Sequence, residues 1–361
     1  MKLSGHRFTT TLAGVILGVG LLASEPTARA GVPVSDQNAA LRYWRAFELQ
    51  DTDSRRAISE LATDLYDKSW KPDQALLDAL AAQSNTIEML IEAANMDHCD
   101  FGVDYNKGVY ALLPHLNRLR SGALLLRIDA RVHALNGDID AAIERIAAIF
   151  LISQHISTER VLISSLVTLA IFAVADELVA FLEDSGHFNE THRQTLGDAL
   201  GRFNKTDPFG IKASVEAERD VIASWMRGIL VDKGLEEGIT TALGLFDFEA
   251  NEMDQVREDI ARRIPDEATA ERMIAAFEQY YTLALHAWDH PDAVTKLERL
   301  QTTYLNNPDG LLVSHFAMHS SMHRSYRRGQ VLFHTAMTRV GLNAPEPTIW
   351  LHQEREPARQ R

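Results

Sequence analysis

The chain is almost devoid of cysteine, because Cys99 is the only one among its 361 residues. A single thiol cannot form an intrachain disulfide, so the fold depends on its hydrophobic core, which a chain of this length can build. Catalysis by Cys99 needs a general base and an electropositive setting. Its neighbours in "DHCDFGVD" are mostly acidic, and nearby negative charge raises the pKa of a thiol. The sequence therefore predicts a structural role for Cys99.

Basic residues are scarce as well. The chain carries 36 Lys and Arg residues against 50 Asp and Glu residues, which gives a net charge of −14 at pH 7. Its basic clusters are short: "HRSYRR" near Tyr326 and the tail "EREPARQR". An acidic surface without a basic stripe repels phosphate backbones, so the composition argues against a nucleic-acid-binding protein. The hydrophobic share of 46% and the charged share of 24% are typical of a soluble globular protein.

Familiar catalytic motifs are missing from the sequence. It contains no G-x-S-x-G, C-x-x-C, H-E-x-x-H or P-loop pattern. The "DFG" at Asp100–Gly102 lacks the other kinase motifs, and "HFNETH" at His187–His192 departs by one residue from the H-x-x-E-H spacing of zinc proteases. "CDFGVDYN" does not have the spacing of a calcium-binding EF-hand loop. The sequence therefore leans against an enzyme without deciding the question.

Runs of alternating β-branched residues are also absent, and amphipathic helices follow one another along the chain. The clearest unit is Gly122–Ile156, which we predict to be two antiparallel helices joined at "NGD". Gly137 suits the left-handed residue that ends a helix, and Asp138 can cap the next one. This hairpin resembles a tetratricopeptide unit, but the pattern does not recur at a fixed period. We predict an all-α fold of packed antiparallel helical hairpins, forming an irregular array or bundle in one or two lobes.

One long apolar segment, "VLISSLVTLAIFAVADELVAFL" at Val161–Leu182, is apolar nearly all the way round a helical wheel. Its uninterrupted part ends at Ala175 and is bounded by charged residues, which makes it too short to span a bilayer. We therefore predict that this segment is a buried central helix of the core.

The middle of the chain resembles a known group of proteins. A lone cysteine in an acidic loop is followed by "LLPHLNRLRSGALLLRIDARVHALNGDIDAAIERIAAIFLISQHISTERVLISSLVTLAIF". This order is similar to that of uncharacterised exported helical proteins common in planctomycete-type bacteria. The resemblance covers about residues 95–180 and contains no catalytic motif. It implies an exported α-helical protein and transfers no functional residues.

The N-terminus has the pattern of a signal peptide. Lys2 and Arg7 precede the apolar stretch "LAGVILGVGLLA", and "ARA" at Ala28–Ala30 offers small residues for cleavage. We predict a signal peptide over residues 1–30, export to the periplasm or cell envelope, and no stable transmembrane segment after cleavage. Retention of this segment as an N-terminal anchor is the alternative.

The rest of the chain divides at "NKTDPFG", a concentration of turn-forming residues at Asn204–Gly210. We predict a helical lobe over residues 31–205 and a second over residues 206–342. Residues 343–361 contain three prolines and mixed charge, which is typical of an extended or disordered tail.

Histidine clusters in the stretch "SHFAMHSSMHRSY", where His315, His319 and His323 recur every fourth residue. On a helical wheel they lie within about 80° of one another, on the same side as Met322 and Phe333, so we expect them to be buried. One interpretation is a metal site, in which a neighbouring pair binds zinc, or copper with help from Met322. The other is packing, with each neutral ring bonded to a facing helix.

A second histidine pair, His286 and His290, lies away from the apolar side of its helix. We expect this pair to face water.

Two functions follow as hypotheses. The first is an exported, non-catalytic scaffold of the cell envelope that binds a protein or peptide partner through a helical surface. The alternative is a metal-binding or metal-dependent protein that uses the histidines of the predicted helix 311–341, with zinc or copper as the candidate metal. The sequence gives neither the identity of the partner nor the oligomeric state.

Overall fold

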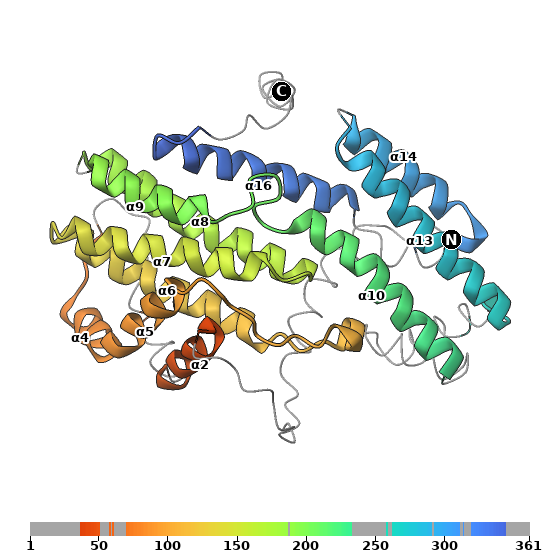
Figure 1. The fold of residues 1–361 in the computed structure, drawn as a ribbon, viewed down its shortest axis with the longest axis horizontal. Coiled ribbons are helices and arrows are strands. Elements are labelled where there is room, and N and C mark those ends of the chain that lie inside the picture. The colour runs from red at the N-terminus through yellow and green to blue at the C-terminus, as the bar shows by residue number, and fades with distance from the viewer. Residues whose placement is uncertain are drawn as a thin grey trace. The chain divides into compact units, whose positions relative to one another are not determined.

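The protein is α-helical in a computed structural model that describes residues 37–50, 58, 60, 70–186, 188–232, 258, 262–290, 292–310, 313 and 319–343. Within these residues no β-strand occurs and the helices pack against one another, which confirms the predicted all-α class (Figure 1). The elements are α2 (Ala39–Leu49), α4 (Gln74–Ala82), α5 (Ser84–Ala94), η2 (Tyr105–Tyr110), α6 (Pro114–Leu135), α7 (Ile139–Ser157), α8 (Leu162–Ser185), α9 (Glu190–Gly201), α10 (Ile211–Asp232), α13 (Glu267–Trp288), α14 (Ala293–Leu305), η3 (Pro308–Gly310) and α16 (His319–Arg339). The predicted signal peptide and the tail beyond Asn343 lie outside the described residues.

The chain forms two compact units. The first contains Val103–Leu113 and Glu216–His323, and the second contains Gly31–Gly102, Pro114–Val215 and Arg324–Arg361. Both units are assembled from separate stretches of chain, whereas the sequence predicted contiguous lobes.

The difference arises in helices α10 and α16, which contain the boundaries between the units. "NKTDPFG" is a turn as expected, but Asp207 in that turn accepts hydrogen bonds from the backbone N–H groups of Ile211 and Ala213 at 3.0 Å each, so it caps α10. Arg339 near the end of α16 bonds the Asp176 carboxylate of α8. Helix α16, the last described helix, is therefore anchored in the second unit through Arg339.

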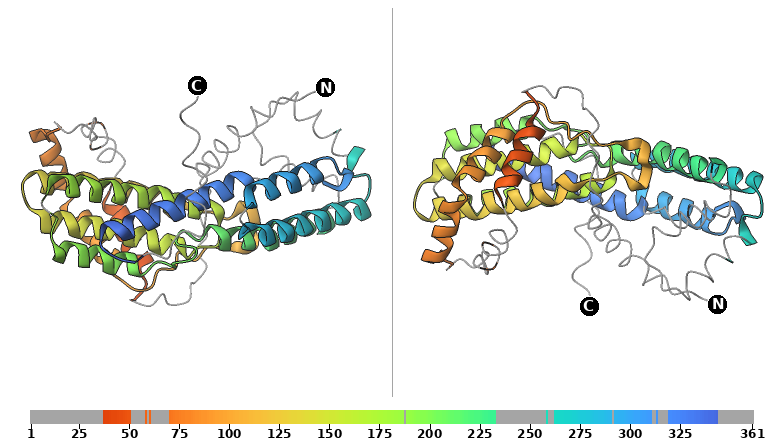
Figure 2. Two further views of the ribbon diagram at one scale, coloured as in Figure 1. Left: turned by 90° about the horizontal axis from the view of Figure 1, so that it is seen from above. Right: turned by 90° about the horizontal axis from the view of Figure 1, so that it is seen from below.

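The α6–α7 hairpin of the second unit forms as the sequence predicts. Gly137 adopts a φ of +82°, which is the left-handed conformation that favours glycine. The Asp138 carboxylate accepts a hydrogen bond from the Ala141 N–H and caps α7. Helices α6, α7 and α8 pack on one another and α9 packs on α7, while α5 and α2 cover one side of this group and α4 contacts α5 (Figures 1 and 2).

Aromatic rings fill the core of the second unit. Phe172 of α8 lies 4.8 Å from the Phe150 ring of α7 and 5.0 Å from Phe209, measured between ring centroids. Phe333 of α16 joins them, 5.7 Å from Phe203. Tilted and edge-to-face pairs of this kind contribute about 0.5–1.5 kcal/mol each beyond the burial of apolar area. The core therefore combines residues from distant parts of the sequence.

Helix α8 is buried on one side only. Within the described part of the chain it is the one helix long and apolar enough to cross a membrane by length and composition, and half of its apolar stretch is buried in the protein. Its buried side packs on α6 and α7, while Leu166, Ala170 and Ala173 are exposed on the other. We predicted a helix surrounded by protein; the structure instead leaves an apolar stripe on the surface.

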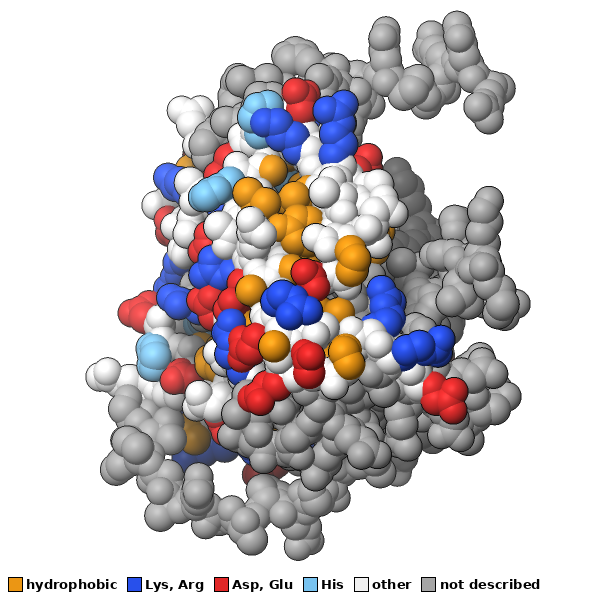
Figure 3. Space-filling model, turned by 90° about the vertical axis from the view of Figure 1, so that its right-hand side faces the viewer, with side chains coloured by type: hydrophobic (Ala, Val, Ile, Leu, Met, Phe, Trp, Pro, Cys, Tyr) orange, Lys and Arg blue, Asp and Glu red, His pale blue; other side chains and the backbone are white. Residues whose placement is uncertain are grey.

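The first unit is built around an α13–α14 hairpin. Asp266 caps α13 by accepting a hydrogen bond from the Thr269 N–H at 2.7 Å, and the last residue of that helix, Trp288, is buried. His286 is exposed, as predicted, and His290 is half-buried. On the face drawn in Figure 3, acidic and basic side chains are interspersed with a few apolar ones. The drawn face therefore carries no large area of a single charge.

Candidate functional site

A buried set of polar and ionisable groups lies in the second unit, where Tyr43, Cys99, His115, His155, Glu159 and Ser164 are close together. We call these six residues the buried polar cluster. They come from α2, the loop after α5, and the helices α6, α7 and α8. His155 occupies the last turn of α7, and Glu159 follows four residues later, just beyond the end of the helix.

His155 bonds to two different elements. Its Nε2 lies 2.9 Å from the backbone carbonyl oxygen of Met96, and its Nδ1 lies 2.9 Å from the Tyr43 hydroxyl. Because a carbonyl oxygen can only accept, Nε2 carries the proton and Nδ1 accepts from Tyr43. Burial lowers the pKa of His155 to about 4, so the ring is neutral near pH 7.

Glu159 is satisfied by two donors. His115 Nε2 lies 2.7 Å from Oε1, and the Ser164 hydroxyl donates to Oε2 at 2.5 Å. The side chains of His115 and Glu159 are only 2% and 9% exposed. The Phe101 ring stacks on His115 with 4.2 Å between centroids. Both carboxylate oxygens are therefore held by protein groups, as a buried charge requires.

Cys99 sits beside this pair and is half-buried. Burial, followed by the negative charges of Glu159 and Asp100, raises the pKa of its thiol far above the ordinary value. A thiol that stays protonated is a poor nucleophile and a poor metal ligand. This agrees with the structural role that the acidic neighbours predicted.

The loop carrying Cys99 is fixed by Asn38. The Asn38 amide donates to the Asp100 carbonyl at 2.8 Å and accepts from the Asp100 N–H at 2.9 Å. The same Asn38 oxygen accepts from the Ala40 N–H at 3.0 Å, so it also caps α2. One side chain thus joins the start of α2 to the cysteine loop.

The buried polar cluster contains groups that perform acid–base chemistry elsewhere, but here they bond to one another. Ser164 and Tyr43 are fully buried, and His155 uses both ring nitrogens for protein contacts. A hollow on the described surface lies elsewhere, along α14, where it is lined by Thr295, Glu298, Arg299, Thr302 and Thr303. The arrangement is that of a hydrogen-bonded junction between helices.

The histidines singled out by the sequence are only partly described. His315 and the side chain of His319 lie outside the described residues. His323 is 1% exposed, as its position on the helical wheel predicted. Its Nε2 lies 3.0 Å from the backbone carbonyl of Trp288, and its ring meets the Trp288 ring edge to face with 5.0 Å between centroids.

The bond to Trp288 requires a proton on the Nε2 of His323, so this nitrogen cannot bind a metal while the bond exists. Among the residues that the structure describes, no group of three or more His, Cys, Asp or Glu side chains is placed to hold a metal ion. Binding of zinc or copper by His315, His319 and His323 stays a prediction.

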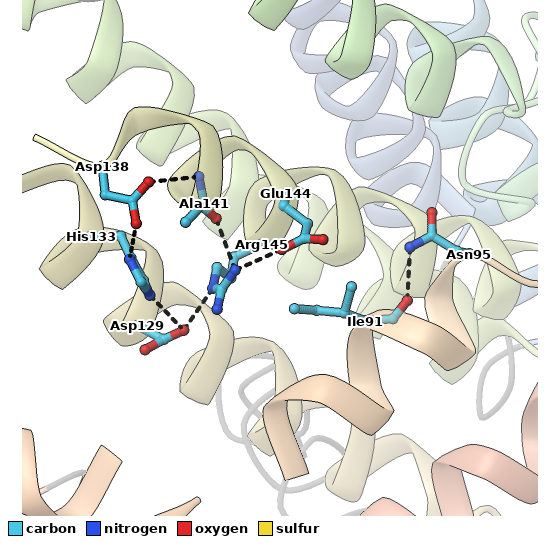
Figure 4. Close-up of polar contacts among 8 residues, drawn as sticks. All are labelled: Ile91, Asn95, Asp129, His133, Asp138, Ala141, Glu144 and Arg145. Carbon is cyan, nitrogen blue, oxygen red and sulfur yellow. Dashed lines mark hydrogen bonds and ion pairs between the residues drawn. The ribbon is translucent and has the colours of Figure 1, made fainter. Parts of the chain in front are cut away.

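A second charged cluster lies at the tip of the α6–α7 hairpin (Figure 4). Arg145 donates to the Asp129 carboxylate at 2.7 Å and to that of Glu144 at 2.7 Å. His133 lies between two carboxylates, with Nδ1 3.0 Å from Asp138 and Nε2 3.7 Å from Asp129. These contacts bind α6 to α7 at a partly solvated edge. Sequence reasoning overlooked them, although Asp129 and His133 are four residues apart on one helix.

The "HFNETH" segment also has a structural use in its described part. The Asn189 side chain accepts from the His192 N–H at 3.0 Å, and His192 Nδ1 accepts from the Asn189 N–H at 3.2 Å. This is a capping box at the start of α9. His192 Nε2 also lies 2.8 Å from the Asp140 carboxylate. His187 lies outside the described residues.

Sequence reasoning missed His115, His155 and Glu159. The only local signal was the four-residue spacing of His155 and Glu159 at a helix end. Tyr43 and His155 are 112 residues apart in the sequence, and His115 and Glu159 are 44 residues apart. Helical periodicity gives no information on contacts between residues this far apart.

No protein-family model matches the chain, no curated protein matches it, and no solved structure matches it. The resemblance to exported proteins of planctomycete-type bacteria therefore stays a prediction.

Proposed function

We propose that this is an exported, non-catalytic helical protein of the cell envelope that binds a partner protein through the surface of its hairpins. Export is supported by the pattern of residues 1–30, with its charged start, apolar stretch and "ARA". A non-catalytic role is supported by the buried polar cluster, whose nitrogens and oxygens bond to one another and whose thiol is kept protonated.

The apolar stripe of α8 is the observation that carries the proposal. Leu166, Ala170 and Ala173 are exposed at spacings of four and three residues, so they lie along one side of the helix. No charged residue interrupts the segment from Val161 to Ala175. Helices that face water carry polar residues on the outer side, whereas an uninterrupted apolar face is suited to burial.

The shape of the stripe favours a helix as its partner. Ala170 and Ala173 have short side chains, which let a second helix approach closely, and Leu166 can fit between side chains of the incoming helix. The expected partner segment is an amphipathic helix that presents leucine-like residues at three- and four-residue spacing.

A photo-crosslinking experiment in envelope extracts tests this proposal. Leu166 and Leu135 are almost equally exposed, at 38% and 39%, but Leu135 ends α6 and lies outside the stripe. A photoreactive amino acid at position 166 should capture one specific protein, and the same amino acid at position 135 should not. Equal capture at both positions, capture of lipid alone, or no capture at either would contradict the proposal.

His323 donates a hydrogen bond from Nε2 to the Trp288 carbonyl, which supports the packing role over the metal alternative. Metal analysis of the purified protein decides that alternative directly.

A further inference from the structure

We propose that His155 is an acid-sensitive clamp. It holds α2 and the cysteine loop, residues 96–102, against the packed helices α6, α7 and α8, and acidification opens this contact. The proposal concerns regulation of the fold and stands apart from the proposed function. It rests on the bonds of one buried ring.

His155 bonds to two parts of the outer layer, by which we mean α2, α5 and the cysteine loop. Tyr43 belongs to α2, and Met96 follows the end of α5, yet both bond to the same imidazole at 2.9 Å. His155 is 4% exposed and Tyr43 is fully buried. Helices α2 and α5 pack on each other and α5 also packs on α7, so the ring adds a buried polar bond to an existing packing contact.

Protonation changes the hydrogen bonds that this ring can make. Neutral His155 accepts from the Tyr43 hydroxyl through Nδ1, but a protonated ring has donors at both nitrogens. The Tyr43 hydroxyl must then act as acceptor, and its own proton needs a new partner inside the core. The neighbouring Cys99 thiol is only a weak acceptor. Burying an unsatisfied hydroxyl beside a new positive charge is unfavourable, so protonation favours the open state.

The charged groups around His155 come from several elements. Asp97 of the loop forms an ion pair at 3.3 Å with Arg202, which follows the end of α9. Arg202 lowers the pKa of His155 and Asp97 raises it. The Met96 carbonyl and Asp97 favour the protonated ring, whereas burial, Arg202 and His98 disfavour it. Glu159, one turn beyond His155, is occupied by His115 of α6 and Ser164 of α8. The balance lowers the pKa of His155 to about 4.

Acid should not open the neighbouring contact in the same way. The contact between His115 Nε2 and the Glu159 carboxylate joins α6 to a residue just beyond α7 and involves neither Tyr43 nor Met96. The opening therefore begins at Tyr43 and Met96 and releases Phe101, which belongs to the same loop and stacks on His115 in the closed state. Separation gives water access to Tyr43 and Cys99 and leaves the α6–α8 core folded.

Hydrogen exchange measured by mass spectrometry between pH 7 and pH 4.5, corrected for the intrinsic pH dependence of exchange, tests the clamp. A shift of the His155 pKa from 6.5 to about 4 predicts a roughly 50-fold increase in opening at pH 4.5. The increase should appear in peptides covering residues 37–50 and 96–102 and should be absent from α7 and α8.

The test variant is His155→Gln, because glutamine can donate to Met96 and accept from Tyr43 but cannot become protonated in this range. It should abolish the acid-induced increase. The matched control, His115→Gln, changes the neighbouring histidine and should keep it. The proposal is overturned if His155→Gln keeps the increase, or if protection is lost throughout the second unit at once.

Labelling of Cys99 in the unaltered protein keeps the proposal testable should His155→Gln fail to fold. A pyridyl disulfide reagent, which still reacts with thiols in acid, should label Cys99 at least 10-fold faster at pH 4.5 than at pH 7 once each rate is divided by the rate for the urea-unfolded protein at the same pH. An equal or lower corrected rate at pH 4.5 would overturn the clamp.

Discussion

His155 in the second unit and His323 in the first are both buried, and both direct Nε2 at a backbone carbonyl near the C-terminal end of a neighbouring helix. His155 bonds Met96, two residues beyond α5, and His323 bonds Trp288, the last residue of α13. The last four carbonyl groups of an α-helix have no backbone N–H partner within the helix. In the first unit His323 satisfies one of them, whereas the Met96 carbonyl bonded by His155 belongs to the turn just after α5. The comparison teaches that a buried histidine can bond a backbone carbonyl at or just past a helix end in a distant part of the chain.

The two histidines differ in their second contact. His155 also accepts a hydrogen bond from the Tyr43 hydroxyl of a third element, whereas His323 meets the side chain of the same Trp288 whose carbonyl it bonds. His155 therefore connects three elements, and we expect its replacement to lower the free energy of unfolding more than replacement of His323.

Replacement of each histidine by leucine should show the largest difference. His155→Leu leaves the Met96 carbonyl and the Tyr43 hydroxyl unsatisfied and should cost about 2–6 kcal/mol, since each unsatisfied group costs about 1–3 kcal/mol. His323→Leu leaves the Trp288 carbonyl and should cost about 1–3 kcal/mol. Native-state hydrogen exchange reads each unit separately. Equal losses in the two variants would break the comparison.

Acid should destabilise the second unit through His155. The folded pKa of this group, about 4, lies below its ordinary value of 6.5, so its contribution to stability is complete above pH 6.5 and is lost as the pH falls toward 4. The loss amounts to up to about 3 kcal/mol, because one pKa unit corresponds to about 1.4 kcal/mol. Urea unfolding at pH 7, 6, 5 and 4.5 measures it. A slope unchanged in His155→Gln would contradict this assignment.

A chelator should separate packing from metal binding at His323. Because Nε2 is used by the Trp288 carbonyl, we expect His323→Ala to lower the free energy of unfolding by about 2 kcal/mol whether or not EDTA is present. Thermal unfolding of wild type and variant, with and without EDTA, gives the comparison. A loss confined to the protein without EDTA, together with stoichiometric metal, would instead support the histidine metal site.

Cys99→Ser should have the smallest effect, below about 1 kcal/mol, although Cys99 adjoins the buried polar cluster. The side chain is half-buried and its thiol stays protonated, so no charge interaction is lost. Chemical denaturation of the variant measures the change. A variant that does not accumulate in soluble form would show that the thiol is essential to the cysteine loop.

Local features of the fold were predictable from the sequence. Gly137 and Asp138 gave the hairpin turn because backbone conformation and capping depend on neighbouring residues. The burial of His323 followed from its side of the helix. The partner of each histidine was not predictable, because Tyr43 and His155 are brought together by the packing of helices far apart in sequence. The assembly of each unit from separate stretches of chain was not predictable for the same reason, since the boundaries between the units fall within α10 and α16.

The discontinuity of the second unit has a consequence for synthesis and transport. A chain that emerges N-terminus first, from a ribosome or a translocation channel, exposes the rings of Phe172 and Phe203 long before Phe333 of α16 arrives to cover them. The unit cannot complete its core until Phe333 of α16 has emerged. For most of its emergence the chain therefore exposes apolar rings, which leaves it dependent on protection from aggregation.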